Sequence, residues 1–244
     1  MELYLTRHGQ TVSNVAHICN GQTGGELTAL GKDQANLLGK RLYDTLFDFV
    51  YCSDLHRTKQ TCSNILFHQP QDTDMSVFYC KEIREINVNG VEGKSWELEQ
   101  KIRYDPKTTF RLSKTGQTDE SWADVFMRVS NFLDGLIQKF VDEKYKSGIT
   151  ESNYIEINSK PNEEYLSQKD VKEMYDKGEL TDDKVKDEGN DKKVLVVAHG
   201  GILAEFMNNI LYLLGKKIAL EIDSYNCTLY KTAKAFSLFS PAVS

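Results

Sequence analysis

The chain has 244 residues, of which 40% are hydrophobic, and this is enough to bury one α/β core without a second domain. The formal net charge is -6, which argues against a broad surface for nucleic acid or anionic membrane, because phosphate groups are held by clustered Lys and Arg. We therefore expect a single domain over residues 1–244, with no nucleic-acid partner and no membrane partner.

The first part of the chain alternates between strand and helix patterns. A short apolar run, Leu3–Thr6, predicts a strand that ends at a polar turn. Thr28 is a candidate N-cap for a helix that would continue to Leu42. The face expected to be buried on that helix comprises Leu30, Gln34, Leu37, Leu38, Arg41 and Leu42. Beyond it, the patterns predict a strand at Phe47–Ser53, a helix at Leu55–Phe67, a strand at Ser76–Cys80 and a loop at Lys81–Lys94.

The later elements continue this alternation. Apolar residues at helical spacing predict a long helix over Glu120–Glu143, with Trp122, Phe126 and Phe132 in the core. Lys193–Ala198 is almost continuously apolar and rich in β-branched residues, which is typical of a central strand buried on both faces. The last expected elements are a helix at Ile202–Leu214 and strands near Asn226–Lys231 and Ala235–Phe239. Together these elements predict a three-layer α/β/α domain with a mostly parallel central sheet.

One polar segment interrupts this pattern. Asp142–Lys192 carries fifteen Asp and Glu against nine Lys, and we interpret it as an acidic insertion. Its middle, Asn162–Lys177, could form a polar helix, with the rest as loop. A solvated surface excursion is the simpler interpretation, and a binding element is the alternative.

The cysteines and the N-terminus bear on location. Five cysteines are an odd number, lack CxxC spacing and mostly lie in apolar segments, which indicates reduced core residues rather than disulfides. The first residues lead directly into a strand pattern without a signal peptide, and no stretch approaches the roughly 18 to 20 apolar residues of a membrane span. We expect a cytoplasmic location.

Charged and imidazole side chains follow three of the predicted strands. Arg7 and His8 end the first strand, Arg57 follows the second, and His199 follows the central one. Because ligands of a parallel sheet collect at the carboxyl ends of its strands, these side chains should meet at one edge. Two arginines placed together need an anionic counterpart, and the beginning of the following helix offers further N–H groups. The sequence therefore predicts a phosphate site at this edge, although each short motif alone has a purely structural alternative.

Four segments in this order resemble the histidine phosphatase superfamily, also called the phosphoglycerate mutase-like family. They are LTRHGQTVSN (Leu5–Asn14), SDLHRTKQT (Ser53–Thr61), REINVNGVEGK (Arg84–Lys94) and VVAHGG (Val196–Gly201). Within the family, the second and third segments and the insertion are similar to the TIGAR-type fructose-bisphosphatases. Two positions depart from the family pattern, Gln10 in place of Glu and Val88 in place of a substrate-facing Tyr, so the resemblance supports the reaction type more strongly than the substrate.

The resemblance implies a role for each matching residue. His8 would be the nucleophile and Glu85 the proton donor, while Arg7, Asn14, Arg57 and His199 would surround the transferred phosphoryl group. Gly200 would offer a backbone N–H, and Asn20 and Gly21 would contact the substrate. His8 must attack as a neutral imidazole, and we expect the neighbouring arginines to lower its pKa. Lys94, Arg84, Arg103 and Arg111 are candidates for binding a second phosphate, with ordinary surface charge as the alternative.

The expected reaction needs no cofactor and no metal ion. The histidines show neither H-x-x-x-H nor H-E-x-x-H spacing, and the two arginines would repel a cation. The leading hypothesis is hydrolysis of a small phosphorylated metabolite, with fructose-2,6-bisphosphate or fructose-1,6-bisphosphate as the expected substrate. The alternatives are a phosphoglycerate mutase, a protein phosphatase and a non-catalytic scaffold, and the oligomeric state is left open.

Overall fold

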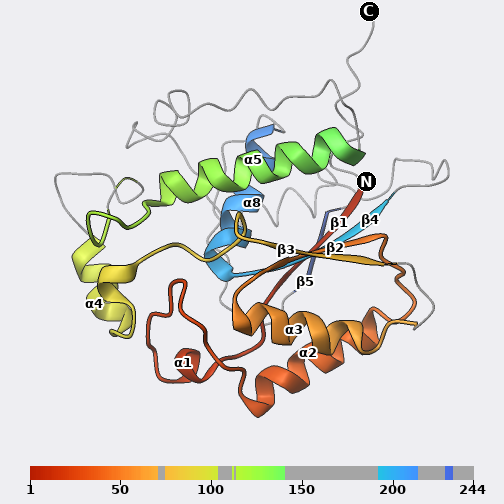
Figure 1. Cartoon of the computed structure of the whole chain (residues 1–244), viewed down its shortest axis with the longest axis horizontal. Coiled ribbons are helices and arrows are strands. Elements are labelled where there is room, and N and C mark those ends of the chain that lie inside the picture. Colours follow the sequence, from red (N-terminus) through yellow and green to blue (C-terminus); the bar gives the residue numbers. More distant parts are fainter. Residues whose placement is uncertain (71–74, 104–111, 113, 141–191, 214–228, 233–244) are drawn as a thin grey trace, which may run out of the picture.

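The computed structural model describes residues 1–70, 75–103, 112, 114–140, 192–213 and 229–232. Its centre is a five-stranded sheet with the strand order β3-β2-β4-β1-β5 (Figure 1). The strands are β1 (Glu2–Arg7), β2 (Phe49–Ser53), β3 (Ser76–Cys80), β4 (Lys193–Ala198) and β5 (Leu229–Thr232). Neighbouring strands are parallel except for β5, which runs antiparallel to β1 at one edge.

Helices cover both faces of the sheet. On one face lie α2 (Ala29–Arg41) and α3 (His56–Leu66), and on the other lie α5 (Trp122–Phe140) and α8 (Gly200–Leu213) (Figure 1). Three short elements complete the described chain: α1 (Val12–Val15), the 3-10 helix η1 (Asn89–Val91) and α4 (Trp96–Arg103). The expected three-layer α/β/α architecture with a mostly parallel sheet is confirmed.

The core lies on both sides of β4. Val194 to Ala198 have no exposed surface, because β4 is flanked by β1 and β2 and covered on both faces. This position explains why the strand is apolar almost without interruption. One apolar cluster packs β1 and β4 against α5 and α8, and a second packs the other sheet face against α2 and α3. The carboxyl ends of β1 and β4 are thereby held rigidly side by side.

The buried face of α2 differs from the expected one. Leu30 and Leu37 are 53% and 64% exposed, whereas Ala35, Leu38 and Leu42 are buried. The cause lies at the start of the helix, where the backbone of Gly31 packs so closely on the backbones of Gly9 and Gln10 that neither glycine has room for a Cβ. This close approach sets the rotation of α2 about its axis, and a count of apolar residues does not detect it.

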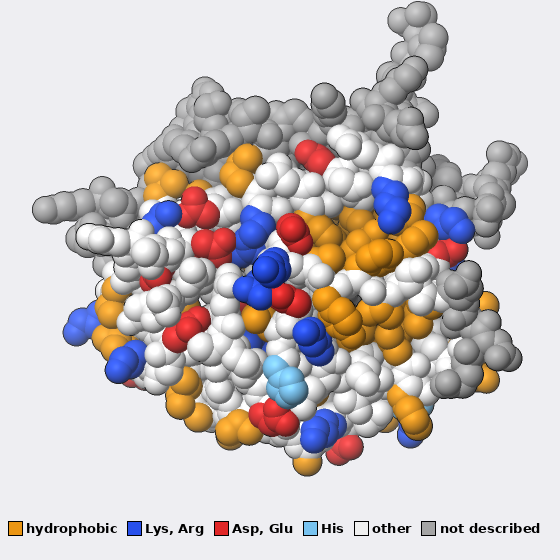
Figure 2. All heavy atoms as spheres, in the orientation of Figure 1, with side chains coloured by type: hydrophobic (Ala, Val, Ile, Leu, Met, Phe, Trp, Pro, Cys, Tyr) orange, Lys and Arg blue, Asp and Glu red, His pale blue; other side chains and the backbone are white. Residues whose placement is uncertain are grey.

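The expectation that all cysteines lie in the core is partly wrong. Cys52 and Cys62 are buried, but Cys19 and Cys80 are only partly buried, and all four are free thiols. Cys227 lies outside the described residues. Cys80 is only partly buried because β3 is an edge strand, whose neighbouring side chains Phe78 and Tyr79 are 40% and 56% exposed. Hydrophobic side chains gather on the right half of the face shown in Figure 2.

Several expectations fall partly or wholly outside the described residues. These are the acidic insertion, apart from its final residue, the last turn of the long helix, the first three residues of the strand expected at Asn226–Lys231, the strand expected at Ala235–Phe239, and the candidate Arg111. The helix expected at Ile202–Leu214 begins two residues earlier, at Gly200, and α1 and α4 were not expected. None of the described helices is long and apolar enough to cross a membrane.

Candidate active site

A cleft of about 230 Å³ opens at the end of β1. Seven of the ten predicted site residues line it, namely Arg7, His8, Asn14, Asn20, Gly21, Arg57 and Glu85. They come from the end of β1, the segment that follows it, the first turn of α3 and the loop after β3. Tertiary structure thus brings together three of the four motifs, and the fourth, at the end of β4, lies directly behind them.

His8 is held with one ring nitrogen available for chemistry. The side chain is 4% exposed, and its Nδ1 lies 2.7 Å from the carbonyl oxygen of Gly9. A carbonyl only accepts hydrogen bonds, so Nδ1 must carry the proton and Nε2 must keep its lone pair. The backbone is fixed as well, because the His8 N–H donates to the Ala198 carbonyl at 3.0 Å. This is the tautomer that a nucleophilic histidine requires.

The charge state of His8 follows from its surroundings. Burial lowers the pKa of His8 well below its usual value, and the positive charges of Arg57 and Arg7 lower this pKa further. The hydrogen bond to Gly9 opposes the shift as a smaller effect. The imidazole is therefore neutral at pH 7, as predicted from the adjacent arginines.

Arg57 binds mainly to the protein backbone. Its Nη1 donates to the carbonyls of Thr23 at 2.7 Å and Gly24 at 3.1 Å, and its Nη2 donates to that of Gly21 at 2.8 Å. Its Nε donates to Nδ1 of His199 at 3.2 Å. A guanidinium has five N–H groups, so these contacts within the described residues leave one for a ligand. Arg57 was expected to offer a rigid fork to phosphate, but here it chiefly holds residues 21–24 in place. Burial lowers its pKa to about 10, so it keeps its charge at neutral pH.

His199 lies behind the cleft and not in its wall. It is fully buried, its Nδ1 accepts from Arg57, and its Nε2 lies 2.8 Å from Oγ of Ser53. Its ring centroid is 5.3 Å from that of His8. Burial lowers the pKa of His199 well below its usual value, with further lowering by the charge of Arg57. The predicted contact of His199 with a phosphoryl group would require one of its two hydrogen bonds to open.

Glu85 faces the start of α8. Its Oε1 accepts from the N–H of Ile86 at 2.9 Å, and its Oε2 accepts from the N–H of Gly201 at 3.4 Å. A side chain on Gly201 would collide with the ring of Trp122 and with the Glu85 carboxylate. Gly200, whose backbone N–H was predicted to contact the substrate, packs against the Arg7 side chain, and its role stays a prediction.

Of the remaining predicted residues, Asn14 and Gly21 belong to the cleft wall, whereas Lys94 and Arg84 do not. Asn14 is oriented by its Oδ1, which accepts from the Thr11 N–H at 3.0 Å and so fixes the position of the amide that lines the cleft. Gly21 has a positive φ of 48°, which suits glycine, and presents its carbonyl to Arg57. Lys94 is exposed and lies away from the cleft wall. Arg84 is also engaged elsewhere, since it donates to Asp54 through Nε and Nη2 at 2.6 Å each.

Apart from Val88, which stands where the family pattern has a substrate-facing Tyr, the rest of the cleft wall was not foreseen from the sequence. It consists of Ile18, Cys19, Ile86, Val88, Trp96, Glu99 and Trp122. Trp96 and Glu99 are three residues apart on α4, so they share one helix face, but the helix itself was missed in the polar segment that contains it. Trp122 was expected in the core, and only the close approach to Gly201 shows that it reaches the cleft.

Within the described ranges, no group of three or more His, Cys, Asp and Glu side chains is arranged to hold a metal ion. The cationic side chains in the cleft wall, Arg7 and Arg57, suit an anion instead. Catalysis without metal stays a prediction, which a chelator tests directly.

Acidification is expected to destabilise the fold through His8 and His199. Both have a pKa well below 6.5 in the folded protein, while the unfolded chain titrates near that value. The unfolded state then binds more protons below that pH, so their stabilising contribution is present above about pH 6.5 and is lost as the pH falls. Two such groups give a slope of up to about 2.7 kcal/mol per pH unit in the free energy of unfolding.

Denaturant titrations over a range of pH values measure this slope. His8→Gln should remove about half of it, while the matched variant of the exposed His17, His17→Gln, should leave it unchanged. A slope that His8→Gln does not alter would contradict the assignment of a buried neutral imidazole.

Comparison with known proteins places this geometry in a family. Residues 3–146 match the model of the histidine phosphatase superfamily (branch 1). A protein named "probable phosphoglycerate mutase GpmB" from Erwinia tasmaniensis is 30% identical over 146 residues, covering 56% of this chain and 63% of its own length. The "fructose-2,6-bisphosphatase TIGAR" of Xenopus tropicalis is 29% identical over 142 residues, covering 58% and 51%. The matched region thus spans between about half and two thirds of these relatives.

Solved structures agree on the fold. The structure of Bacillus stearothermophilus YhfR superposes with a TM-score of 0.61 at 20% identity, covering 94% of this chain and 89% of its own. A phosphoglycerate mutase from Bacillus anthracis gives a TM-score of 0.62 at 19% identity, covering 95% and 86%. The family match covers more than half of the sequence and includes His8, Arg57 and Glu85, so this chain belongs to the histidine phosphatase superfamily.

Proposed function

We propose that this protein hydrolyses a small phosphorylated metabolite through a phosphohistidine formed on His8. The observation that carries the proposal is the buried, neutral imidazole of His8, which keeps the lone pair on Nε2 at a cleft also lined by Arg7, Arg57 and Glu85. This set supplies a nucleophile, positive charge for the phosphoryl oxygens and a group for proton transfer.

The reaction proceeds in two balanced steps. In the first, Nε2 of His8 bonds to phosphorus while the bond from phosphorus to the leaving oxygen breaks, and Glu85 gives that oxygen a proton. In the second, Glu85 takes a proton from water as the water oxygen attacks phosphorus, and the bond from phosphorus to Nε2 breaks. Inorganic phosphate leaves, and both side chains return to their starting states. The arginines stabilise charge in both steps, and no metal ion takes part.

The proposed substrates are fructose-2,6-bisphosphate and fructose-1,6-bisphosphate. The motif resemblance and the similarity to a TIGAR protein over 142 residues support this choice. The cleft wall adds a constraint, because among the described residues its cationic side chains are Arg7 and Arg57 alone, which suit one phosphoryl group. A sugar monophosphate is therefore the necessary comparison in any assay.

The test is release of phosphate in EDTA from a panel of substrates. The panel contains both fructose bisphosphates, fructose-6-phosphate, 2,3-bisphosphoglycerate, 3-phosphoglycerate and a phosphopeptide, each with the wild type and with His8→Ala. We expect release that persists in EDTA and is lost in His8→Ala. Full activity of the variant, or no release from any substrate, would overturn the proposal and favour a non-catalytic scaffold.

A phosphoglycerate mutase is the second candidate, favoured by the GpmB relative. A mutase uses the same phosphohistidine but returns the phosphoryl group to substrate before water reaches it, which requires a closed site. Stimulation of 3-phosphoglycerate conversion by 2,3-bisphosphoglycerate would identify this activity. Preference for the phosphopeptide would instead identify a protein phosphatase.

Glu99 is expected to select against a second phosphate. Its carboxylate lines the same cleft and is only partly exposed, so it repels a dianion placed at the distal end of the substrate. Glu99→Gln should raise kcat/KM for fructose-1,6-bisphosphate about threefold to tenfold, with little change for fructose-6-phosphate. Glu97→Gln on the same helix is the matched control, because Glu97 is exposed. A fall in kcat/KM for both substrates would instead mean that Glu99 binds hydroxyl groups of the sugar.

We also propose a cytoplasmic location. The four described cysteines are free thiols, which supports a reducing compartment. Mass spectrometry of the protein isolated with thiol alkylation would test this, and disulfides among these cysteines would contradict it.

A further inference from the structure

The loop that carries Glu85 has no regular structure of its own. It connects β3, which ends at Cys80, to η1, which begins at Asn89. The Glu85 carboxylate makes one bond to the next residue in the chain and one longer bond to Gly201. The position of the Glu85 carboxylate therefore depends on the contacts that fix the backbone of residues 82–87.

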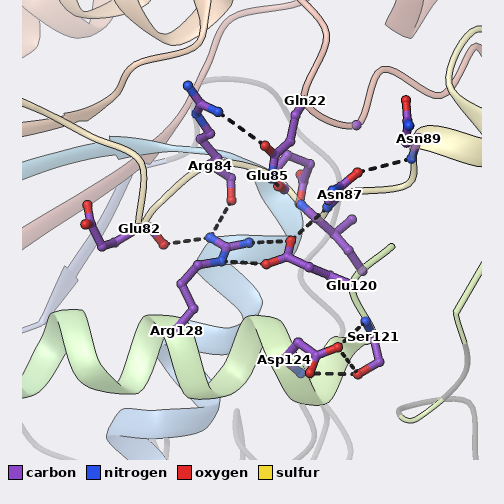
Figure 3. A network of polar contacts seen from close by, with 12 residues as sticks. Gln22, Glu82, Arg84, Glu85, Asn87, Asn89, Glu120, Ser121, Asp124 and Arg128 are labelled. Carbon is purple, nitrogen blue, oxygen red and sulfur yellow. Dashed lines mark hydrogen bonds and ion pairs between the residues drawn. The ribbon is translucent and has the colours of Figure 1, made fainter. Parts of the chain in front are cut away.

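Arg128, on the first third of α5, holds the part of the loop before Glu85. Its Nη1 donates to the carbonyls of Glu82 at 2.6 Å and Arg84 at 2.8 Å (Figure 3). These two carbonyls belong to the residues that precede Glu85 in the loop. Three residues of backbone are thus fixed against a rigid helix that packs on α8 through the shared apolar cluster.

Glu120 holds the part of the loop after Glu85. Its Oε2 accepts from the Asn87 N–H at 2.8 Å, and its own N–H donates to the Asn87 carbonyl at 2.9 Å. Arg128 orients this carboxylate through two parallel bonds, from Nε to Oε1 and from Nη2 to Oε2, each 2.9 Å long (Figure 3). The bidentate ion pair between Arg128 and Glu120 therefore binds the loop backbone on both sides of Glu85.

The opposite face of the loop is held by groups near the phosphate site. The side-chain amide of Gln22 donates to the Glu85 carbonyl at 3.0 Å, and Arg84 is paired with Asp54. Gln22 belongs to the segment that Arg57 holds. Like Gln22, Arg84 and Asp54, neither Arg128 nor Glu120 lines the cleft. Any effect of this pair on turnover must reach the substrate through another residue.

We infer that Arg128 and Glu120 are positioning residues that place Glu85 for proton transfer to the leaving group. This inference rests on the proposed function. Proton transfer requires hydrogen-bond reach in the transition state, and a displacement of about 1 Å can cost on the order of 100-fold in rate. Loosening the pair should therefore weaken protonation of the leaving oxygen while His8 and the arginines remain in place.

The test uses the acidity of the leaving group. Arg128→Lys keeps the positive charge near His199 but replaces the planar fork, which serves four acceptors, with a single ammonium. The rate constant kcat/KM, which reports phosphorylation of His8, is measured with p-nitrophenyl phosphate, phenyl phosphate and glycerol 2-phosphate. p-Nitrophenolate leaves without a proton, whereas an alkoxide needs one.

We expect Arg128→Lys and Glu120→Gln to lower kcat/KM for glycerol 2-phosphate about tenfold to 100-fold and for p-nitrophenyl phosphate less than about threefold. Glu85→Gln should show the same selectivity with a larger amplitude, and combining it with Arg128→Lys should add little further loss. The control is Lys192→Met, which removes the ion pair to Asp48 at the other end of the sheet and should leave the leaving-group dependence unchanged.

Two results separate this inference from the proposed function. The first result is that Glu85→Gln lowers kcat/KM selectively for glycerol 2-phosphate, but Arg128→Lys and Glu120→Gln lower it equally for all three substrates or not at all for glycerol 2-phosphate. This result would overturn the positioning role of the pair and leave the proposed function in place. The second result is that Glu85→Gln lowers kcat/KM equally for all three substrates. It would show that Glu85 is not the proton donor, and the proposed mechanism would then be wrong. Activity on p-nitrophenyl phosphate also shows that a variant is folded. If either Arg128→Lys or Glu120→Gln loses this activity, the test rests on the other variant.

Discussion

Replacing His8 by alanine is expected to lower kcat/KM for the best substrate by about 10⁴-fold or more, because the nucleophile of a two-step transfer has no substitute in the cleft. Arg7 and Arg57 remain in the variant, so affinity for inorganic phosphate should change less than about tenfold. Steady-state kinetics measure the first effect, and competition by phosphate in an equilibrium binding assay measures the second.

The same variant tests the covalent intermediate. Wild-type protein mixed briefly with a ³²P-labelled substrate and quenched in alkali should carry acid-labile label, and His8→Ala should carry none. The matched control is His68→Ala, since His68 bonds to Asn36 outside the cleft wall. Acid-labile label on His8→Ala would assign the nucleophile to another residue.

Replacing Arg57 by methionine is expected to damage both stability and turnover. The variant leaves the carbonyls of Gly21, Thr23 and Gly24 and the Nδ1 of His199 without their donor. The acceptors on Gly21 and His199 are buried and should each cost about 1 to 3 kcal/mol in the free energy of unfolding, whereas Thr23 and Gly24 are exposed and their carbonyls can bind water. kcat/KM should fall at least about 10³-fold, because the variant loses a positive charge beside the phosphoryl group as well as the order of residues 21–24.

Denaturant titration and kinetics at one pH measure the two losses of Arg57→Met. Arg41→Met is the matched control, because Arg41 is exposed at the end of α2, and its loss should cost less than about 1 kcal/mol. Unchanged stability of Arg57→Met would show that Arg57 does not hold the loop. The stability and kcat/KM of Arg57→Lys should lie between those of the wild type and Arg57→Met, because Lys restores the charge but not the four directed bonds.

The cleft combines a cation pair with an apolar and aromatic wall. Arg7 and Arg57 lie beside His8, while the partly buried Trp96 and Trp122 lie elsewhere in the wall with Val88 behind them. Val88 is fully buried in contact with the core, so the departure from the family tyrosine removes a hydroxyl group from this wall. We therefore expect the wall to recognise the uncharged part of a substrate mainly by shape and apolar contact, with Glu99 as a polar exception.

Local patterns in the sequence were sufficient to predict the layers and the neutral state of His8. The strand periodicity of β1, β2 and β4 and the helical periodicity of α5 are properties of neighbouring residues, so they can be read without knowing the fold. The neutral state of His8 could be predicted because Arg7 is adjacent in sequence and Arg57 follows the next strand. The rotation of α2, by contrast, depended on the contact between Gly9 and Gly31, which no periodicity contains.

The sequence by itself therefore determined the α/β/α architecture, the family and the residues that meet at the ends of the strands. Only the tertiary structure decided that Arg57 binds the backbone of residues 21–24, that His199 lies behind His8, and that Lys94 is not part of the cleft wall. The physical reason is that hydrogen bonds of buried side chains are made to whichever backbone groups distant loops bring near. The contacts of Arg128 and Glu120 with the Glu85 loop were equally hidden from the sequence, because the loop residues that they bind lie more than thirty residues away along the chain.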